Sequence, residues 1–409
     1  MTKIGIFNPY LETRGGGEKM CLAAASILSK SGYDVSMITH GKVSLEDLGK
    51  YLEVDLSRVS LVVVKPSFTT KVVNRLPLPG GLKHFFSDQA VFRIIKKGNF
   101  DVLINNCFQS NLPNPAKHGI YLCMFPQKIK AKNGYSFIKA AYWAVIRMLY
   151  RLTMHPVHKH PVYTYDQILA ISQYTKGYVQ KYWDVDSTIL YPICDNMLAS
   201  SPTEKEKMII HVGRFFERLD ANHHKKQDFL LESFKKMESL IKQGWQLHFV
   251  GSVAEDVGAL KYILHLLKEA RGYPIYFHFN SPRDELKKLY NSASIYWHAT
   301  GYGGNAEKYP ESQEHFGITT IEAMTAGCIP VVFNSAGQKE SVIQGENGFL
   351  WNNAKELDEL TNKVASMSPI EQKALRAKAQ ESAIKFGRQN FDKHVLEILG
   401  QVVNTPEAK

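Results

Sequence analysis

The sequence lacks the marks of several protein classes. Its five cysteines are Cys21, Cys107, Cys123, Cys194 and Cys328. They lie far apart and form no C-x-x-C pair, which argues against a structural zinc cluster and favours reduced thiols in the cytoplasm. No apolar run approaches the roughly 18–20 residues needed to cross a bilayer, and the longest candidate near the middle, 140–146, ends at Arg147. The opening MTKIGIFNPY has no signal-peptide core and predicts a strand. We therefore expect a soluble or peripheral cytoplasmic protein.

Internal repeats and low-complexity tracts are also missing. The composition, with 44% hydrophobic and 22% charged residues, is ordinary. It excludes a largely disordered chain, a collagen-like repeat and a disulfide miniprotein. At roughly 100–200 residues per domain, the length of 409 residues predicts two or three globular domains.

Basic residues outnumber acidic ones. Fifty Lys and Arg residues against 39 Asp and Glu residues give a net charge of +11, and the sequence pI is about 9.1. Such a surplus favours partners that bear phosphate, whether nucleic acid, an anionic membrane or a nucleotide. The basic residues are spread along the chain and form no recognisable nucleic-acid reader, so we do not expect nucleic acid as a partner.

Short apolar runs alternate with helical stretches along the chain. The expected strands are Lys3–Asn8, Asp34–Thr39, Leu61–Lys65, Asp101–Asn105, Gly119–Phe125, Gln167–Ser172, Thr188–Tyr191, Met208–Val212, Gln246–Gly251, Ile275–Asn280, Ser294–Ala299 and Ile329–Asn334. Amphipathic helices are expected at Lys19–Lys30, Phe229–Ile241 and Leu260–Arg271. Most strands lack strict apolar and polar alternation, as strands covered on both faces do. The pattern predicts an α/β protein with parallel sheets.

A polar, turn-rich stretch, Ala199–Lys207, precedes a fresh apolar strand, and we interpret it as a linker between two α/β domains. The expected domains are residues 1–198 and 199–385, followed by a C-terminal helix at 386–409. Open parallel sheets bind ligands at the carboxyl ends of their strands. Two such edges that face each other across a cleft would form the default binding site.

The most informative segment is Glu314–Pro330, EHFGITTIEAMTAGCIP. It predicts a loop that enters a helix at about Ile318–Ala326. Gly317 allows a close backbone approach to a ligand, and the free N–H groups of the helix start suit a phosphate. Glu314 before the helix and Glu322 one turn into it can each accept hydrogen bonds from hydroxyl groups. The arrangement suits a sugar joined to a nucleoside diphosphate. Spacing alone leaves open that they are two surface glutamates at the ends of a turn.

This segment resembles a known family. The E-x7-E spacing, the intervening HFG and the trailing EAM-x-AG-x-IPVV are similar to glycosyltransferase family 4, the retaining enzymes of the GT-B fold. EHFGITTIEAM most resembles the branch of the lipid-linked-oligosaccharide mannosyltransferases. Further motifs follow in the family's order, namely GGGEK, AISQYT, LYPICD, HVGRF and HFVGS. The resemblance covers about Lys3–Trp351 and implies two Rossmann-like domains with parallel sheets facing a central cleft.

The resemblance also implies a cationic grip on the donor diphosphate. It assigns this role to Arg214 and to a lysine about ten positions on, since fixed cations stabilise a departing nucleoside diphosphate. The chain carries an insertion here, FFERLDANHHKKQ, and aligning the helix FLLESF selects Lys225, with Lys226 left open. A solvated basic turn is the alternative interpretation of this pair.

The other donor contacts follow from the same resemblance. Glu322 would hold the nucleoside ribose, and Glu314 the hydroxyls of the transferred sugar. Close backbone approach is implied at Phe316, Gly317 and Ile318, and from the opposing domain at Gly16 and Gly17. His298 ends a strand at this edge, where it is either a donor contact or a packed core histidine.

No general base and no metal site are expected. Family members commonly carry a histidine in the segment matching YLCMFPQ, where this chain has Met124. Enzymes of this type are thought to let the donor phosphate take the acceptor's proton. Asp184-Val185-Asp186 matches the metal-binding D-x-D of another glycosyltransferase fold, but its surroundings do not fit that fold. We therefore expect neither a metal nor any other cofactor.

The segment 128–160 is basic and aromatic. At helical spacing, Ile138, Ala141, Tyr142, Val145, Met148, Leu149 and Leu152 share one stripe. Lys139, Trp143, Arg147 and Arg151 lie elsewhere around the helix. Such a helix is typical of an anionic lipid surface. The alternative is a helix that packs its stripe on the sheet and exposes ordinary charges.

Together these features predict a retaining, metal-independent glycosyltransferase. It would move a hexose from a GDP- or UDP-linked donor to a glycan or polyprenyl-linked acceptor at the inner, cytosolic membrane face. Mannose is the first expectation and rests only on the similarity to one branch. Transfer to a soluble acceptor and a non-catalytic scaffold on the same fold remain alternatives.

Overall fold

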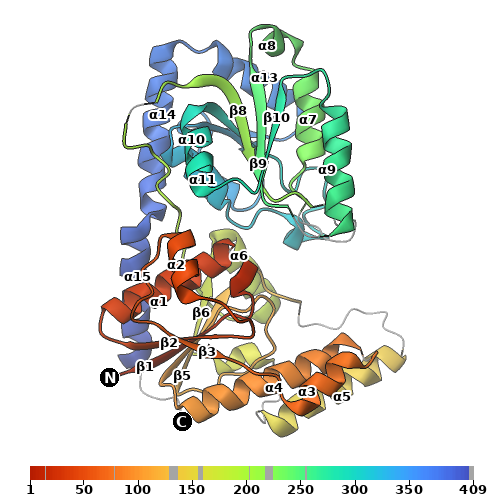
Figure 1. Cartoon of the computed structure of the whole chain (residues 1–409), viewed down its shortest axis with the longest axis vertical. Coiled ribbons are helices and arrows are strands. Elements are labelled where there is room, and N and C mark those ends of the chain that lie inside the picture. Colours follow the sequence, from red (N-terminus) through yellow and green to blue (C-terminus); the bar gives the residue numbers. More distant parts are fainter. Residues whose placement is uncertain are drawn as a thin grey trace. The chain divides into compact units, whose positions relative to one another are not determined.

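The computed structural model describes residues 1–13, 15–77, 79–128, 137–154, 160–201, 203–216, 224–253 and 256–404, with the side chains of 74 and 137–140 outside that description. The chain divides into two compact units. The first comprises Met1–Ile193 and Gln389–Lys409, and the second comprises Cys194–Arg388. Each unit is built around one sheet (Figure 1).

The first unit contains a seven-stranded sheet in the order β3-β2-β1-β4-β5-β6-β7, and its strand pairs are parallel. The strands are β1 Lys3–Phe7, β2 Asp34–Thr39, β3 Ser60–Val63, β4 Val102–Asn105, β5 His118–Cys123, β6 Gln167–Ala170 and β7 Thr188–Ile189. The helices are η1 Leu11–Thr13, α1 Gly16–Lys30, α2 Leu45–Leu52, α3 Phe68–Arg75, α4 Gly80–Gly98, α5 Phe137–Thr153, η2 Pro161–Thr164, α6 Gln173–Trp183 and α15 Arg388–Asn404.

Both faces of this sheet are covered, because alternate strand residues point to opposite sides. Ile104 and Leu122 line a small apolar cavity together with side chains of α1 and α15. Their neighbours Leu103 and Cys123 belong to a core that also includes residues of α4 and α6. The final helix α15 therefore packs against α1 within the first unit.

The second unit contains a six-stranded sheet in the order β10-β9-β8-β11-β12-β13, again with parallel pairs. The strands are β8 Glu206–Val212, β9 Gln246–Gly251, β10 Ile275–Phe279, β11 Ala293–His298, β12 Ile329–Phe333 and β13 Phe349–Trp351. The helices are α7 Gln227–Lys235, α8 Glu238–Lys242, α9 Val257–Glu269, α10 Arg283–Ser292, η3 Pro310–Ser312, α11 Ile318–Thr325, α12 Gln338–Ser341, α13 Ala354–Ser366, α14 Pro369–Ala383 and η4 Ile384–Phe386.

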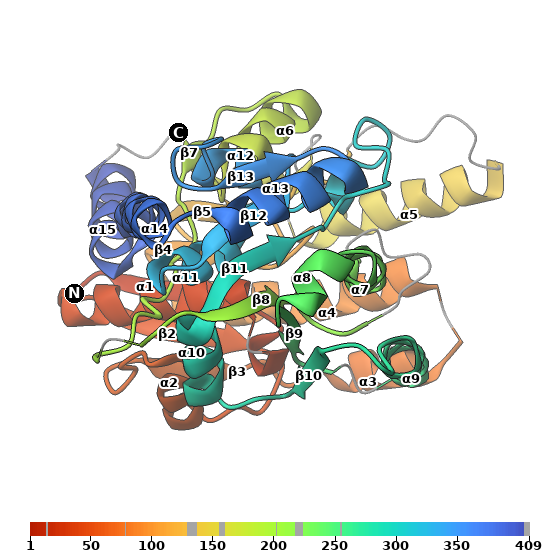
Figure 2. The ribbon, with the colours of Figure 1, turned by 90° about the horizontal axis from the view of Figure 1, so that it is seen from above.

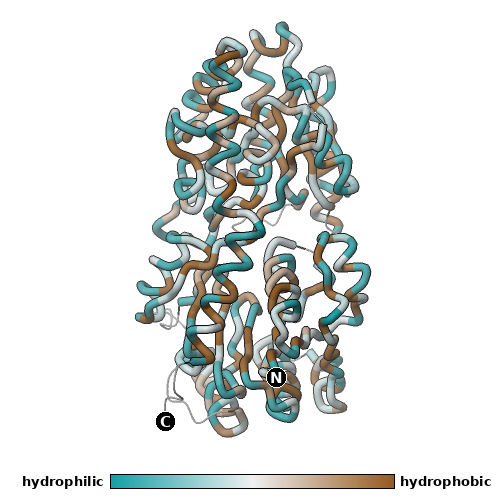
Figure 3. The backbone as a smooth tube through the Cα atoms, turned by 90° about the vertical axis from the view of Figure 1, so that its left-hand side faces the viewer, coloured by the Kyte–Doolittle hydropathy of each residue, from teal (hydrophilic) through white to brown (hydrophobic). Residues whose placement is uncertain are grey.

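Helices also cover both faces of the second sheet. Figure 2 shows α10, α11 and α14 along one side of the strands and α7, α8, α9 and α13 along the other. The second group encloses a core that includes Trp297 and Trp351, both fully buried. Figure 3 shows hydrophobic and hydrophilic residues alternating along the helices, as expected of helices with one face on a sheet.

The predicted α/β class with two Rossmann-like sheets is confirmed, and local details differ. The short strand β13 was not predicted. The expected helix Phe229–Ile241 is broken between α7 and α8, where Met237 adopts a non-helical conformation as the N-cap of α8. Residues of the expected linker pack on the second unit, where the backbone N–H of Ala199 donates to Asn291 at 2.9 Å. The first boundary therefore falls at Ile193, earlier than expected.

Each sheet has one point where the strand order reverses. In the first unit it lies between β1 and β4, and in the second between β8 and β11. Connections leave such a point in opposite directions, so a crevice opens at the carboxyl ends of the two strands. The motifs GGGEK and HVGRF follow β1 and end β8 respectively, so both lie at these points.

Candidate active site

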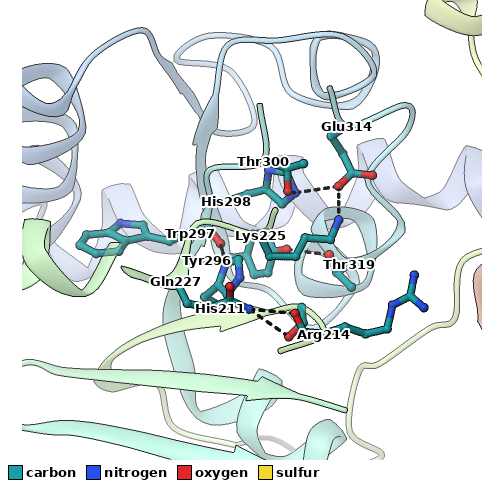
Figure 4. A network of polar contacts seen from close by, with 11 residues as sticks. His211, Arg214, Lys225, Gln227, Tyr296, Trp297, His298, Thr300, Glu314 and Thr319 are labelled. Carbon is teal, nitrogen blue, oxygen red and sulfur yellow. Dashed lines mark hydrogen bonds and ion pairs between the residues drawn. The ribbon is translucent and has the colours of Figure 1, made fainter. Parts of the chain in front are cut away.

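A charged cluster lies at the reversal point of the second sheet. His298 is the last residue of β11, and Lys225 precedes α7, whose connection starts from β8. The Lys225 Nζ donates to Glu314 Oε2 at 2.7 Å, and the His298 Nε2 lies 3.0 Å from the same oxygen (Figure 4). The Thr300 hydroxyl lies 3.2 Å from His298 Nε2. Three segments distant in the sequence thus meet at one carboxylate oxygen.

The environment fixes the charge of this cluster. Burial on its own would raise the pKa of Glu314, but Lys225 and His298 together hold that pKa well below its usual range. Burial lowers the pKa of His298, although the hydrogen bond to Glu314 and its negative charge act to raise that pKa. Since an ionised carboxylate only accepts, His298 Nε2 carries the proton of a neutral imidazole. The cluster therefore holds an ionised glutamate, a lysine ammonium and a neutral histidine.

Two groups at the site remain open to a ligand. Both described bonds of Glu314 end on Oε2, which leaves Oε1 available among the described residues. The Lys225 ammonium has three donors and uses one of them on Glu314. A hydroxyl and a phosphate can therefore be bound beside each other without breaking the existing bonds.

A second histidine, His211 of β8, lies next to His298 inside the sheet. His211 is fully buried in β8, with its Nδ1 2.9 Å from the carbonyl oxygen of Trp297. Burial, reinforced by nearby His298, lowers the pKa of His211 to about 3. The rings of His211 and His298 are 6.4 Å apart. His211 Nε2 and His298 Nδ1 have no hydrogen-bond partner within the described parts of the chain.

The turn after Glu314 is held tightly. Gly317, the N-cap of α11, has φ +96°, and a Cβ there would lie 2.6 Å from the Gln338 side chain, so this position requires glycine. Tyr296 of β11 bonds the Thr319 hydroxyl at 2.7 Å, which ties the first turn of α11 to the sheet. The free N–H groups of that turn are consequently fixed in direction.

The remaining residues of the motif are mostly buried. Glu322 lies in α11 with 9% of its surface exposed. Phe316 is buried and packs edge-to-face on Phe386, with ring centroids 5.3 Å apart. Ile318 is half-buried at the helix start. Glu314 and Glu322 thus lie on either side of the Gly317 turn, the first beside Lys225 and the second within the α11 layer.

Arg214 extends from the loop after β8. Its carbonyl oxygen accepts a hydrogen bond from the Gln227 side chain at 3.1 Å, which ties this loop to the start of α7 near Lys225. The guanidinium lies 5.8 Å from the ring of Phe216, and Figure 4 shows the side chain extending away from the ion pair. Among the described residues, no carboxylate is paired with it. The structure thus places Arg214 and the Gly317 turn at the same edge of the sheet.

Gly16 and Gly17 lie in the first unit, at the start of α1 and the reversal point of that sheet. The Gly17 carbonyl accepts from Asn106 at 2.8 Å. A Cβ on Gly17 would lie 2.0 Å from the methyl carbon of Met124. Met124, which replaces the histidine common in the resembling family, therefore packs directly on this glycine.

The two carboxylates of the D-x-D match, Asp184 and Asp186, bond to different neighbours. Asp184 accepts from Gln180 at 3.1 Å, whereas Asp186 pairs with Lys176 at 3.1 Å. Over the described ranges, no group of three or more His, Cys, Asp and Glu side chains is arranged to hold a metal ion.

Helix α5 carries three of the four predicted membrane contacts as exposed side chains: Trp143, Arg147 and Arg151. The Lys139 side chain lies outside the described residues. The expected single stripe is wrong, because α5 turns Ile146, Leu149 and Tyr150 inward, and the Tyr150 hydroxyl donates to Asp88 of α4 at 2.6 Å. Val145, Met148 and Leu152 of that stripe are exposed. Within the described chain, no helix has the length and hydropathy needed to span a membrane.

Sequence reasoning missed the supporting residues of the site. The sequence shows His211 only as part of the motif HVGRF and Gln227 only as part of the insertion. Their supporting roles depend on contacts with residues that are distant in the sequence. Thr300 could have been found, because a hydroxyl two residues after a strand-ending histidine lies at the same edge.

Comparison with known proteins first concerns the second unit. Residues 195–386 match the family described as "Glycosyl transferases group 1". A Xenopus tropicalis protein named GDP-Man:Man(3)GlcNAc(2)-PP-Dol alpha-1,2-mannosyltransferase is 26% identical over 56% of this chain and 47% of its own length. The Dictyostelium discoideum protein of the same name is 23% identical over 98% of this chain and 85% of its own length. The chain thus spans about half the length of the Xenopus relative.

Solved structures show the same fold. A glycosyltransferase from Rickettsia africae superimposes with a TM-score of 0.66 at 16% identity, over 99% of both chains. The Anabaena protein HepE, solved in complex with UDP, gives a TM-score of 0.63 at 15% identity, over 98% of this chain and 100% of its own. Residues 195–386, which include the Glu314 cluster at the β8–β11 edge, thus match a glycosyltransferase family model, and the chain has the GT-B fold.

Proposed function

We propose that the protein transfers a hexose, with retention of configuration and without a metal, from a nucleotide sugar to a lipid-linked glycan. The observation that carries this proposal is the contact between Lys225 and Glu314, at 2.7 Å. It places a cation suited to phosphate beside a carboxylate suited to sugar hydroxyls. That juxtaposition matches the bond that such an enzyme breaks, which joins a sugar to a diphosphate.

The diphosphate is held by cations and backbone amides. Arg214 and Lys225 neutralise the charge that gathers on the leaving diphosphate, and they do so as fixed groups that need no reorganisation during the reaction. The amides at Gly317 and Ile318, held by the Tyr296–Thr319 bond, are oriented for the phosphate oxygens. Lys226 is not part of this grip, because the contact to Glu314 is made by Lys225.

The carboxylates read the hydroxyl groups. Glu314 accepts hydrogen bonds from the transferred sugar through Oε1, while Lys225 and His298 keep Oε2 in place. His298 thus acts by positioning Glu314. Glu322 accepts from the ribose hydroxyls, which requires the nucleoside to reach a side chain that is largely buried.

Metal independence follows from the charges at this edge. Two cations beside the leaving group supply the stabilisation that a divalent ion provides in other phosphate-transfer sites. The proton of the acceptor hydroxyl passes to the leaving phosphate, because Met124 offers no base where the resembling family often has a histidine.

The substrates are inferred from the relatives. Two of them are named for GDP-Man as donor and a PP-Dol-linked glycan as acceptor, and the HepE structure contains UDP. We favour GDP-mannose and a polyprenyl-diphosphate glycan, with UDP-linked hexoses as the alternative donors. A lipid-linked acceptor places the reaction at the cytosolic face of a membrane.

Helix α5 supports a membrane location. Its exposed side carries Val145, Met148 and Leu152 beside Trp143 and Arg147. Apolar side chains mixed with tryptophan and arginine suit the boundary between lipid headgroups and acyl chains. We therefore propose that the first unit meets the membrane through α5, where a lipid-linked acceptor is presented.

The test combines binding with product analysis. A thermal-shift screen with GDP, UDP and their common hexose conjugates should identify the donor by the largest stabilisation. The protein is then incubated with that donor and with vesicles that contain a polyprenyl-diphosphate glycan. It should form a glycosylated lipid even in the presence of EDTA. With an α-linked donor, NMR of the product should show an α-linkage. Inverted product or a strict manganese requirement would contradict the mechanism. If no nucleotide binds, the proposed activity is wrong and a non-catalytic scaffold on this fold is the better interpretation.

A further inference from the structure

Helix α9 in the second unit has two apolar faces. One packs into the unit, through Ala259, Tyr262, Ile263 and Leu266, all buried. The other points outward and consists of Val257 at 70% exposed, Leu260 at 56%, Leu264 at 58% and Leu267 at 40%. These four positions recur every three or four residues, so they form one continuous stripe along the helix. Scattered exposed leucines are ordinary, but a continuous stripe of them is not.

The fold does not need this stripe. The helix is fixed by its buried face and by its N-cap, where Asp256 accepts from the backbone N–H of Ala259 at 2.8 Å. Tyr262 reaches the start of α7, where the backbone N–H of Asp228 donates to its hydroxyl at 3.2 Å. Since the helix is held in place from the inner side, the outward leucines are available for a partner outside the unit.

The charged residues beside the stripe are basic, apart from the exposed Asp256, whose carboxylate is engaged as the N-cap of α9. Lys261 and Lys268 are exposed on the outward side of α9, and exposed Arg271 follows its end. The acidic residue within the helix, Glu269, lies on the other side and faces Lys235 of α7 at 3.5 Å. The outward surface therefore combines aliphatic side chains with positive charge, which suits an anionic lipid surface.

The size of the surface argues against a second copy of the chain as the partner. At 1.5 Å per residue and a width of about 10 Å, the 13 residues of α9 present roughly 200 Å². A stable protein interface buries about 800 Å² on each partner. A bilayer has no such minimum, because even a narrow apolar stripe enters the boundary between headgroups and acyl chains.

We propose that α9 is a second lipid-contacting element, which docks the donor-binding unit on an anionic membrane. The four aliphatic side chains enter the headgroup boundary, and Lys261, Lys268 and Arg271 lie at the level of the phosphates. The inference deepens the proposed function and rests on its membrane location. It adds that the unit carrying the donor site makes its own lipid contact, in addition to the contact of α5.

The test is co-sedimentation of the full chain with phosphatidylcholine vesicles, with and without phosphatidylglycerol. The double variant Leu260→Glu, Leu264→Glu removes two apolar contacts and places two negative charges against the lipid. It should raise the lipid concentration for half-binding at least about tenfold on the anionic vesicles. The matched control is Ile370→Glu, Ile384→Glu, which makes the same change at exposed isoleucines of the same unit. It should bind like the wild type.

Each result decides the inference. It is wrong if the α9 variant sediments like the control, or if the wild type does not bind the anionic vesicles. It is also wrong if the wild type is a dimer in sedimentation velocity and the α9 variant a monomer with unchanged lipid binding. Nucleotide-induced stabilisation of the α9 variant should equal that of the wild type, which shows that its second unit is folded. Failure of the wild type to bind any nucleotide would instead count against the proposed function.

Discussion

The two sheets reverse their strand order in the same way, but their reversal points carry opposite kinds of side chain. In the second unit the edge holds Lys225, Glu314 and His298 in one bonded network, with Arg214 beside it. In the first unit the edge brings Met124 onto Gly17, a contact between a thioether and bare backbone. One edge holds a bonded network of a lysine, a glutamate and a histidine, while the other holds a methionine on bare backbone beside the amide of Asn106.

This difference teaches that topology provides the place for a ligand and side chains decide which ligand it is. A diphosphate requires fixed cations, and the second unit supplies them. Substitutions at one edge at a time test this difference between the two units.

The largest effect is expected from Arg214→Ala. The variant loses a cation that stabilises the leaving diphosphate, so kcat should fall about 10²–10³-fold. The loss in donor affinity should be smaller, because the charge develops mainly in the transition state. Steady-state kinetics with the identified donor measure both. Full activity in this variant would remove Arg214 from the site and weaken the contrast between the two edges.

Glu322→Ala should weaken donor binding. Two ribose hydroxyls lose a charged acceptor, which costs about 1.5–3 kcal/mol, or roughly a 10- to 100-fold rise in the donor Kd. Calorimetric titration with the nucleoside diphosphate measures this without acceptor. Unchanged affinity would show that Glu322 is only a structural residue of α11.

His211→Gln should flatten the pH dependence of stability. His211 has a pKa of about 3 in the folded state, against about 6.5 in an unfolded chain. The unfolded state therefore binds the proton first, and stability is lost as the pH falls below about 6.5. Between pH 7 and pH 5 this single group should cost about 2 kcal/mol. Urea unfolding at both pH values should show the loss in the wild type and less of it in the variant. Identical losses would mean that His211 is not held neutral.

The proposed lipid contact of the first unit is tested by the double variant Val145→Glu, Met148→Glu. The change should raise the vesicle concentration for half-binding about tenfold, since α5 loses apolar contacts and gains negative charge. Donor-induced stabilisation should stay as in the wild type, because α5 carries none of the proposed donor contacts. A variant that sediments normally would leave α5 as an ordinary surface helix and favour a soluble acceptor.

The smallest effect is expected from metal removal. Treatment with EDTA should leave the transfer rate unchanged, because Arg214 and Lys225 provide the positive charge. A strict need for manganese would instead direct attention to Asp184 and Asp186, although these two bond to different neighbours.

Local features of the fold were predictable from the sequence. The helix after Gly317 was expected at about residues 318–326 and spans Ile318–Thr325, because the glycine start and the apolar pattern are both local. The three-residue strand β13 was missed. The face that α5 buries depends on α4, which the segment alone does not reveal.

The site could be predicted only in part for a similar reason. Motif spacing nominated Glu314 and Glu322, which lie on one turn and helix. The contact between Lys225 and Glu314 joins positions 89 residues apart across a sheet edge, and no local pattern encodes it. The supporting bond of His211 to the Trp297 carbonyl is equally distant, at a separation of 86 residues.

The proposed grip of Lys225, paired with Glu314, on the donor diphosphate is measured by titrating GDP and UDP into the wild type, Lys225→Ala and Lys226→Ala in a calorimeter. Circular dichroism checks that the three proteins are folded. The neighbouring lysines differ in that Lys225 alone of the two bonds Glu314 among the described residues. We predict that the better nucleotide binds the wild type and Lys226→Ala alike and binds Lys225→Ala at least tenfold more weakly, about 1.4 kcal/mol. Equal binding to all three proteins would contradict the account.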